Sequence, residues 1–307
     1  MSLVSIVTPS FNQSAFLERT ILSVLEQDHT ELEYLIADGG STDGSLDIIN
    51  KYAGRLAWWT SEKDEGQAQA INKGFAHAHG EIIAWLNSDD TYLPGAVRSA
   101  VKIFEKHPQT NLLYGDMLAV DELDRTINIM KYRQLSLVDL LCFQIIGQPA
   151  VFMRRSAFEK AGRLDNNLHY LLDHQLWIRI AEQGQILHVN ETWAAARYHA
   201  GAKNLAQPAG FSEEAFRVLD WASKEPALAR AGRRAPASAL RFNARYLLDG
   251  GQPKAALKAW FQALILHPPT ALARLNLAVS AVLDLIGLRS VRTLILKSRR
   301  ARLTGVR

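Results

Sequence analysis

Short apolar runs alternate with helix-like segments through the first third of this 307-residue chain. The runs are rich in β-branched and aromatic residues, as strands are, whereas the segments between them have the length of helices. We expect strands at residues 3–8, 32–37, 56–60, 82–86 and 111–114, and helices at 14–27, 44–52, 67–79 and 95–107. Because parallel strands need long, usually helical crossovers, this alternation predicts an α/β fold with a mostly parallel sheet flanked by helices.

The alternation breaks after residue 115, which suggests a second half built onto the same sheet. Residues 117–129 resemble a hairpin, 150–154 and 193–199 resemble strands, and 173–183 have the pattern of a helix. We therefore expect one domain over residues 1–205, with its halves at 1–115 and 116–205.

A helical C-terminal extension is expected over residues 206–307. Residues 231–237 resemble a linker between two helical pieces, and 244–268 resemble one tetratricopeptide-type hairpin that turns at Gly250 and Gly251. Since a lone hairpin cannot bury its apolar face, we expect it to pack on the main domain or on a partner.

The composition is that of a globular protein with a substantial core. A single cysteine, Cys142, excludes an internal disulfide framework and a multi-cysteine zinc site, which fits a reducing compartment. The N-terminus lacks the features of a signal peptide, and no apolar stretch reaches 18 residues. We expect a cytoplasmic protein.

Seven Arg or Lys and no acid follow residue 288, so this basic tail predicts a peripheral contact with anionic lipid rather than with nucleic acid.

Each of the first four expected strands is followed by a cluster of polar residues. The clusters are Thr8-Pro9-Ser10-Phe11-Asn12, Asp38-Gly39-Gly40-Ser41-Thr42-Asp43, Glu62-Lys63-Asp64-Glu65-Gly66-Gln67 and Asn87-Ser88-Asp89-Asp90. Helix capping needs one short polar residue, not a whole cluster. Because the ends of parallel strands share one edge of the sheet, where ligands bind, the clusters predict a site there.

Asp89 and Asp90 are the most informative members of these clusters. Two adjacent carboxylates at a strand end suit a hard divalent cation, which prefers oxygen ligands, although they also suit the start of the following helix. The chain has neither a G-x-G-x-x-G turn after its first strand nor a P-loop, which argues against a dinucleotide fold and a P-loop nucleotide site.

These motifs, in this order, resemble those of the family 2 glycosyltransferases, which have the GT-A fold and use nucleotide-diphospho-sugars. The likeness covers roughly residues 1–205 and includes Val7-Thr-Pro-Ser-Phe-Asn12, Ile36-Ala-Asp-Gly-Gly-Ser-Thr-Asp-Gly44, Asn72-Lys-Gly74 and Leu86-Asn-Ser-Asp-Asp90. The resemblance implies a Rossmann-like sheet and a divalent cofactor, Mn²⁺ or Mg²⁺.

By this resemblance the nucleotide-sugar contacts are assigned to Pro9, Asn12, Asp38, Ser41, Asp43, Asn72, Lys73, Asn87 and Lys203. The family's D-x-D motif falls on Asn87-Ser88-Asp89, so its first position is Asn, whose amide can still bond a ribose hydroxyl. The metal then depends on Asp89, Asp90 or both, and the motif leaves that choice open. His199 falls near a family segment in which a His reaches the metal or the diphosphate.

Glycosyl transfer also requires a base that takes the proton of the acceptor hydroxyl. The resemblance assigns this role to Asp173, which opens an acidic helix start followed by Trp177 and Arg179. Trp177 is either an apolar platform for a sugar or a core residue. Gln148 precedes a strand on the acceptor side.

The sequence thus predicts an inverting glycosyltransferase, with a donor that we expect to be UDP-linked. The acceptor is expected to be a saccharide or a lipid-linked molecule in polysaccharide, lipopolysaccharide or glycan assembly. Two alternatives remain. A sugar nucleotidyltransferase would share the metal carboxylates, and a non-catalytic nucleotide-sugar-binding scaffold would explain Asn87 and the tetratricopeptide-like hairpin.

Overall fold

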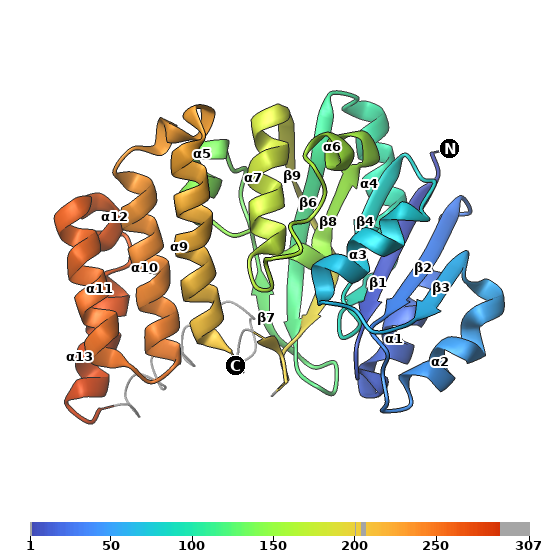
Figure 1. Ribbon diagram of the computed structural model, residues 1–307, viewed down its shortest axis with the longest axis horizontal. Coiled ribbons are helices and arrows are strands. Elements are labelled where there is room, and N and C mark those ends of the chain that lie inside the picture. The colour runs from blue at the N-terminus through green and yellow to red at the C-terminus, as the bar shows by residue number, and fades with distance from the viewer. Residues whose placement is uncertain (1, 200, 204–206, 289–307) are drawn as a thin grey trace. The chain divides into compact units, whose positions relative to one another are not determined.

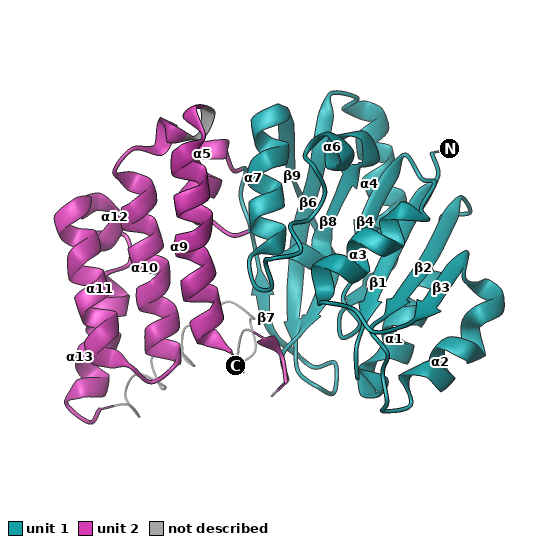
Figure 2. Ribbon diagram, viewed as in Figure 1, with its two compact units in different colours: residues 1–134, 146–198 teal, residues 135–145, 199–307 magenta. Residues whose placement is uncertain are grey.

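The computed structural model describes residues 2–199, 201–203 and 207–288, and the chain divides into two compact units (Figure 2). The first unit comprises Met1–Gln134 and Ile146–Tyr198, and the second comprises Leu135–Ile145 and His199–Arg307. The division that we predicted after residue 205 differs from these units in two places. The short segment 135–145 belongs to the second unit, as do residues 199–205.

The first unit is built on one mixed sheet with the strand order β3-β2-β1-β4-β8-β6-β9-β5, and β7 pairs with β6 (Figure 1). The strands are β1 Val4–Ser10, β2 Leu32–Asp38, β3 Trp58–Ser61, β4 Ile82–Trp85, β5 Thr91–Tyr92, β6 Thr110–Val120, β7 Thr126–Met130, β8 Val151–Arg154 and β9 Gln185–Arg197. The first four strands pair in parallel, as predicted. In the other half β8 is antiparallel to β4 and β6, whereas β9 is parallel to β6.

Helices cover both faces of this sheet. They are α1 Ser14–Leu25, α2 Ser45–Tyr52, α3 Gln67–Ala76, α4 Ala96–Lys106, α6 Arg155–Lys160 and α7 Leu172–Gln183. Helices α1, α2 and α4 share one core cluster with Val4 and Ile6 of β1. The aromatic rings of α3, α6 and α7 meet around Trp85 on the other face. The α/β architecture with a GT-A-like sheet and flanking helices is therefore confirmed.

Strand β1 lies at the centre of the parallel half and is buried along its whole length. A strand covered on both faces reads as a nearly continuous apolar run, which is why its sequence was easy to recognise. Helix α3 approaches this strand closely at Gly74, because a Cβ there would lie 2.4 Å from Cγ1 of Val7. Glycine at this position sets the distance between the helix that carries Asn72 and Lys73 and the sheet.

The second unit is helical. Its elements are α5 Leu137–Leu141, α9 Pro208–Lys224, the 3-10 helix η3 Pro226–Ala231, α10 Arg234–Asp249, α11 Pro253–Leu266, α12 Pro268–Leu272 and α13 Leu275–Leu285. Helices α10 and α11 form the expected hairpin around Gly250 and Gly251, and its apolar face is covered by α9, α12 and α13 of the same unit. The sequence did not lead us to expect this packing within the helical unit itself, and the expected packing on the main domain or on a partner stays a prediction.

Three further sequence expectations need correction. The patch 231–237 is not a linker throughout, because α10 already begins at Arg234. Strand β9 begins at Gln185 rather than at residue 193, and the short elements β5, α5 and α6 were not expected.

Within the described ranges no helix has the length and apolarity to cross a bilayer. The basic tail after residue 288 lies outside the described residues.

Candidate active site

Polar residues from neighbouring strands reach the same edge of the sheet. In the sheet register Ser10 of β1 lies opposite Asp38 of β2, and Asp38 lies opposite Ser61 of β3. Strand β4 pairs in parallel with β1, so residues 87–90 leave the sheet in the same direction. The predicted clusters therefore do converge on one edge, as expected for strand ends of a parallel sheet.

The carboxylate of Asp38 organises the loop that follows β2. It is buried, and its Oδ2 accepts hydrogen bonds from the backbone N–H of Gly40 at 3.1 Å, the N–H of Ser41 at 2.8 Å and Oγ of Ser61 at 2.7 Å. Its Oδ1 accepts one from Oγ of Ser41 at 2.6 Å. An ionised carboxylate has about four acceptor positions, so Oδ1 retains room for another donor.

The loops after β1 and β2 are bonded to each other. The backbone N–H of Asn12 donates to Oγ of Ser41 at 2.8 Å, and Oδ1 of Asn12 accepts from the N–H of Thr42 at 2.9 Å. Asn12 has φ 51°, a left-handed conformation that Asn adopts more readily than most residues. Pro9 is buried in β1, whereas Phe11 is 60% exposed beside Asn12. The two loops thus form one rigid rim with an exposed aromatic ring.

Asp43 joins the starts of two helices to this rim. Its Oδ2 accepts from the N–H of Ser14 in α1 at 2.8 Å, and its Oδ1 accepts from the N–H and Oγ of Ser45 in α2 at 3.1 and 2.6 Å. Partial burial alone would raise the pKa of Asp43, but these hydrogen bonds outweigh it and lower the pKa. Asp43 is therefore used in holding the loops together.

Asn72 and Lys73, which the resemblance assigns to the nucleotide-sugar, both lie in α3. The Nδ2 of Asn72 donates to the carbonyl of Leu164 and to Oδ1 of Asn166, both at 2.9 Å, and its Oδ1 accepts from the N–H of Leu164. The ammonium of Lys73 pairs with Glu62 at 2.8 Å, and both side chains remain partly exposed. Asn72 thus ties α3 to a loop, while Lys73 is held at the surface by an ion pair that water weakens.

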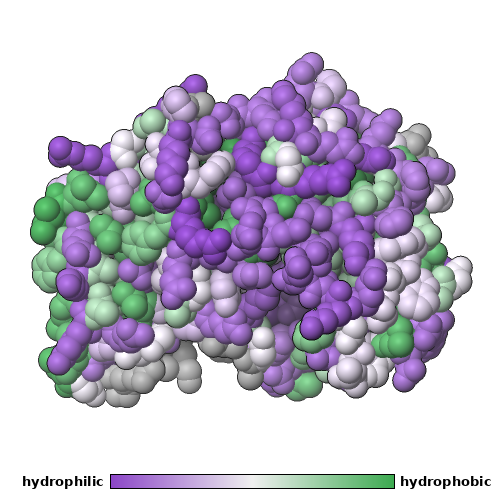
Figure 3. Space-filling view, viewed as in Figure 1, coloured by the Kyte–Doolittle hydropathy of each residue, from purple (hydrophilic) through white to green (hydrophobic). Residues whose placement is uncertain are grey.

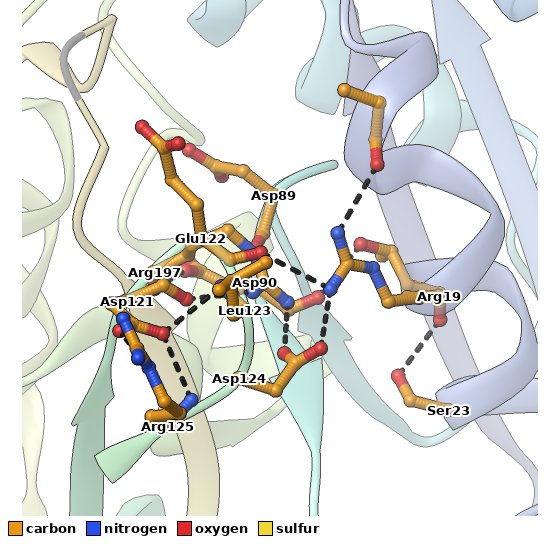
Figure 4. A network of polar contacts seen from close by, with 12 residues as sticks. Arg19, Ser23, Asp89, Asp90, Asp121, Glu122, Leu123, Asp124, Arg125 and Arg197 are labelled. Carbon is orange, nitrogen blue, oxygen red and sulfur yellow. Dashed lines mark hydrogen bonds and ion pairs between the residues drawn. The ribbon is translucent and has the colours of Figure 1, made fainter.

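The two adjacent carboxylates after β4 lie in different surroundings. Asp90 is buried, and its Oδ1 accepts from the N–H of Arg197 at 2.9 Å. Burial and the neighbouring Asp89 raise the pKa of Asp90 well above its usual range, despite hydrogen bonds from Arg197 and Asn87. Asp89 is only half-buried. Figure 4 shows its side chain pointing away from the polar network that contains Asp90.

Asn87 lies between this pair and α3. Its Oδ1 accepts from Nε2 of Gln67 at 2.6 Å, and its Nδ2 lies 3.4 Å from Oδ2 of Asp90. These two contacts fix the orientation of the amide, and its oxygen and its nitrogen each have capacity for one further hydrogen bond.

Arg197 fixes the loop that carries both carboxylates (Figure 4). Its Nε donates to the carbonyl of Asp89 at 2.9 Å and its Nη1 to the carbonyl of Asp121 at 3.0 Å, while Nη2 pairs with Asp124 at 2.6 Å. The side chain is almost fully buried. Arg19 of α1 reaches the same Asp124. The turn between β6 and β7 is thus clamped against the Asp89 loop.

Sequence reasoning did not assign a role to Arg197. A signal was available, because Arg197 ends a strand whose preceding residues, Ala194 to Ala196, are small and apolar. Arginine is rarely fully buried unless it is paired, so its place in such a strand indicates a specific set of acceptors.

Asp173 lies in the first turn of α7, and its Oδ1 accepts from the N–H of His174 at 2.7 Å. One turn later Trp177 is fully buried and stacks on Trp85 of β4, with 5.2 Å between ring centroids. Of the two roles considered for Trp177, a sugar platform or a core residue, the structure gives it the role of a core residue.

Gln148 reaches the same strand end, because its Nε2 donates to the carbonyl of Trp85 at 2.8 Å. Its Oε1 is buried and has no partner among the described residues.

His199 and Lys203 belong to the second unit. His199 is buried, and Lys203 is exposed. Their predicted contacts with the metal and the donor stay predictions.

The family model described as glycosyl transferase family 2 matches residues 5–162, which is more than half of the chain. The chain belongs to this family. It is 30% identical over 189 residues to the putative teichuronic acid biosynthesis glycosyltransferase TuaG of Bacillus subtilis, covering 59% of this chain and 73% of that protein. It is 25% identical to an uncharacterized glycosyltransferase of Rickettsia typhi over 64% of each chain. An uncharacterized glycosyltransferase of Nostoc is 32% identical over 41% of this chain and 39% of its own length. The chain thus matches less than two thirds of the latter two relatives.

Solved structures share the fold of this family 2 chain at low sequence identity. The S. aureus protein TarS, residues 1–349 in complex with UDP-GlcNAc, aligns with a TM-score of 0.65 and 17% identity over 96% of this chain and 92% of that one. The mannosyltransferase PcManGT from Pyrobaculum calidifontis, in complex with GDP-Man and Mn²⁺, aligns with a TM-score of 0.61 and 19% identity over 94% and 87% of the two chains.

A divalent cation at this site would need ligands from the substrate as well as from the protein. Among the described residues no group of three or more His, Cys, Asp or Glu side chains is arranged to hold a metal. Asp90 is buried and accepts from the N–H of Arg197, whereas Asp89 is only half-buried. Mg²⁺ is often held by one or two carboxylates together with substrate phosphates. The site therefore suits a cation that arrives with a diphosphate, and not an all-protein cage.

Proposed function

We propose that this chain is an inverting glycosyltransferase that moves a sugar from a nucleotide-diphospho-sugar to an acceptor hydroxyl. The observation that carries the proposal is the shared sheet edge, where the polar loops after β1 and β2 are hydrogen-bonded to each other and the loop after β4, which carries Asp89 and Asp90, leaves the sheet in the same direction. Family membership supports the same reaction class.

The nucleoside end of the donor is assigned to the rim formed by the first two loops. Asp38 accepts from the base through the free position on Oδ1, and Pro9, Asn12 and Ser41 line the pocket. Phe11 adds an exposed ring on which a base can stack. Asp43 contributes by fixing the rim. We assign a UDP-linked donor, supported by the fold shared with TarS, which was solved with UDP-GlcNAc.

The phosphate end is assigned to the loop after β4 and to α3. Asn87 bonds a ribose hydroxyl, and Lys73 exchanges its exposed partner Glu62 for the diphosphate. Asn72 holds α3 in place for this contact. Asp89 would hold Mn²⁺ or Mg²⁺ together with the diphosphate, and the contacts of His199 and Lys203 with the metal and the donor stay predictions from the sequence. When bound, such a cation neutralises the charge of the leaving diphosphate.

Asp173 serves as the base. It takes the proton of the acceptor hydroxyl as that oxygen bonds to the anomeric carbon. The bond from this carbon to the diphosphate oxygen breaks, and the nucleoside diphosphate leaves with the electron pair. Attack opposite the leaving group inverts the anomeric configuration. Gln148 lies on the acceptor side, where its buried Oε1 can accept from a hydroxyl of the acceptor.

A panel of nucleotide sugars with Mn²⁺ tests the donor assignment. The correct donor should raise the melting temperature, and incubation with it should release a nucleoside diphosphate. Donor binding without Mn²⁺ should be weaker, because the negative diphosphate would then face the Asp89 carboxylate with no cation between them. A melting shift with a nucleotide sugar that is never followed by release of a nucleoside diphosphate would favour the alternative of a non-catalytic nucleotide-sugar-binding scaffold.

The rival enzyme class is a sugar nucleotidyltransferase, which would release pyrophosphate from a nucleoside triphosphate and a sugar phosphate. Supplying both pairs of substrates and identifying the released product by ion-exchange chromatography separates the two. Pyrophosphate release would overturn the transferase assignment.

The acceptor is proposed to be a saccharide or a lipid-linked saccharide of polysaccharide, lipopolysaccharide or glycan assembly. TuaG, a relative by sequence, is named for teichuronic acid biosynthesis, which is consistent with a polymer acceptor. The basic tail after residue 288 is proposed to hold the cytoplasmic enzyme to an anionic membrane, and removing residues 289–307 should weaken that attraction at low salt.

A further inference from the structure

The last helices of the second unit expose an unusual amount of apolar surface. Figure 3 shows apolar side chains gathered over α11, α12 and α13. The exposed large apolar residues of these helices and of the residues just after α13 are Phe261, Ile265, Leu272, Leu275, Val279, Val282, Leu285, Ile286 and Leu288. Ile265 is 84% exposed and Ile286 62%. Contiguous apolar patches of this kind mark interaction sites.

The exposed residues are in register along α13 and its end. Leu275, Val279, Val282 and Ile286 follow one another at spacings of four, three and four residues, so they form one stripe on the helix surface. Another face of α13, with Ala278 and Ala281, is buried against the rest of the unit. Phe261 and Ile265, four residues apart, form a second stripe on the neighbouring helix α11.

Helix α13 is the last helix that the structure describes, and its pattern is not that of a helix at the end of a helical stack. Stacked helical units generally end in a helix whose outer face is polar, because that face meets water. The outer positions of α13 are apolar instead, and among its described residues Asn276, Ser280 and Asp284 are the polar ones. The stripe named above, with Phe261 and Ile265, is called here the outer face.

The charge around the outer face identifies what covers it. The described residues 250–288 contain three basic residues and one acid, Asp284. Lys254, Lys258 and Arg274 of this segment are exposed on or beside α11 and α12. Apolar residues flanked by cations are the composition of surfaces that lie in the headgroup region of anionic bilayers.

We propose that the outer face of α11 and α13 is inserted into the surface of an anionic membrane. A second copy of the chain is a poorer occupant, because a two-fold contact through this face would bring Lys254, Lys258 and Arg274 of two copies together. The inference goes beyond the proposed tail contact and does not depend on transferase activity. The tail attracts through charge, whereas the outer face adds apolar burial that salt does not screen.

Vesicle flotation of the full chain distinguishes these contributions. We use Val279→Asn with Val282→Asn in one variant and Ile265→Gln in another, on phosphatidylcholine vesicles with and without phosphatidylglycerol. At 0.5 M NaCl, where surface charge is screened, the double variant should bind anionic vesicles about tenfold less than the unaltered chain. Ile265→Gln, at a more exposed position, guards against a folding defect and should lower binding in the same direction.

The matched control is Leu123→Asn, which removes an exposed apolar side chain from the first unit. Its binding should equal that of the unaltered chain, and circular dichroism should show the same melting for all variants. Equal vesicle binding of the outer-face variants and the control would overturn the proposal. So would a dimer of the unaltered chain, measured by light scattering, that the Val279→Asn, Val282→Asn variant converts to a monomer, because the face would then be covered by a second copy.

Discussion

The two compact units distribute their large apolar side chains in opposite ways. The sheet unit buries Trp85, Trp177 and Trp193, and among its described residues the exposed large apolar ones are Phe11, Leu46 and Leu123. The helical unit packs its centre with alanine around Trp260. Eleven of its described large apolar residues are exposed.

This difference separates two kinds of working surface. In the sheet unit the candidate working surface is a polar edge. The loops that follow β1 and β2 lie there and are hydrogen-bonded to one another. In the helical unit small side chains let the helices approach closely, and larger ones remain for the outside. We propose chemistry for the first unit and membrane attachment for the second, and the comparison is consistent with that division.

The strongest way to break this comparison is to remove the proposed base. Asp173→Asn should lower transfer by about 10²–10⁴-fold, because the acceptor hydroxyl loses its proton acceptor. Donor binding and vesicle flotation should stay unchanged. Steady-state kinetics with the identified donor provide the measurement, and unaltered turnover would show that another group is the base.

The clamp on the Asp89 loop sharpens the assignment of chemistry to the sheet unit. Asp124→Asn should weaken Mn²⁺-dependent donor binding by about 10–100-fold, because Arg197 loses its charged partner and holds the Asp89 carbonyl less firmly. Isothermal titration of the donor with and without Mn²⁺ measures this. Arg125→Lys is the control, since Arg125 bonds Asp121 at the surface. An equal effect of both variants would remove the positioning role from Arg197.

Because the core of the helical unit is packed with alanine, we expect its stability to be sensitive to larger side chains at buried positions. Ala263 is fully buried between helices, so Ala263→Leu should destabilise this unit by about 1–3 kcal/mol through overpacking. Gln262→Leu, at an exposed neighbouring position, should have little effect. Calorimetry should show an earlier transition that nucleotide sugar does not shift. A single transition that the donor raises in both variants would mean that the units unfold together.

The smallest expected effect concerns the buried carboxylate of Asp90. Its pKa is raised in the folded state by burial and by Asp89, so the native chain binds this proton more tightly than the unfolded chain. Stability should therefore fall as the pH rises from the ordinary value of an Asp through the raised one.

Asp90→Asn removes this titration while its Oδ1 can still accept from Arg197. The stability of the variant relative to the unaltered chain should thus increase as the pH rises through that window. Urea unfolding at a series of pH values measures the difference. A difference that does not depend on pH would contradict the assignment.

Much of the parallel half was predictable because its strands are buried on both faces. Each of β1, β2 and β4 reads as an apolar run, and the helices between them have clear length. Strand β9 was expected to begin at residue 193, because its first part alternates apolar with polar residues such as His188 and Asn190. The elements α5 and α6 have only five and six residues, too few for a helical period to be recognised.

The location of the site could be predicted from the sequence, but the roles of its individual residues could not. Strand-end topology located the polar edge from residue types alone. It could not separate Asp89 from Asp90, since the two differ in burial and in their distance from Arg197, and neither is a local property of the sequence. Asn72 and Asp43 likewise carry bonds to segments that are distant along the chain.

The short helix α5 has a consequence for how a ribosome makes this protein. Its segment leaves the sheet unit and packs in the helical one, where the ring of Phe143 meets that of Phe242 and the carbonyl of Cys142 accepts from Arg241. About a hundred residues must be translated between these partners, which takes roughly 5–20 s. During that delay Leu140, Leu141 and Phe143, buried in the finished chain, have no helical partner to cover them. Chaperones that bind nascent apolar segments would find their target here.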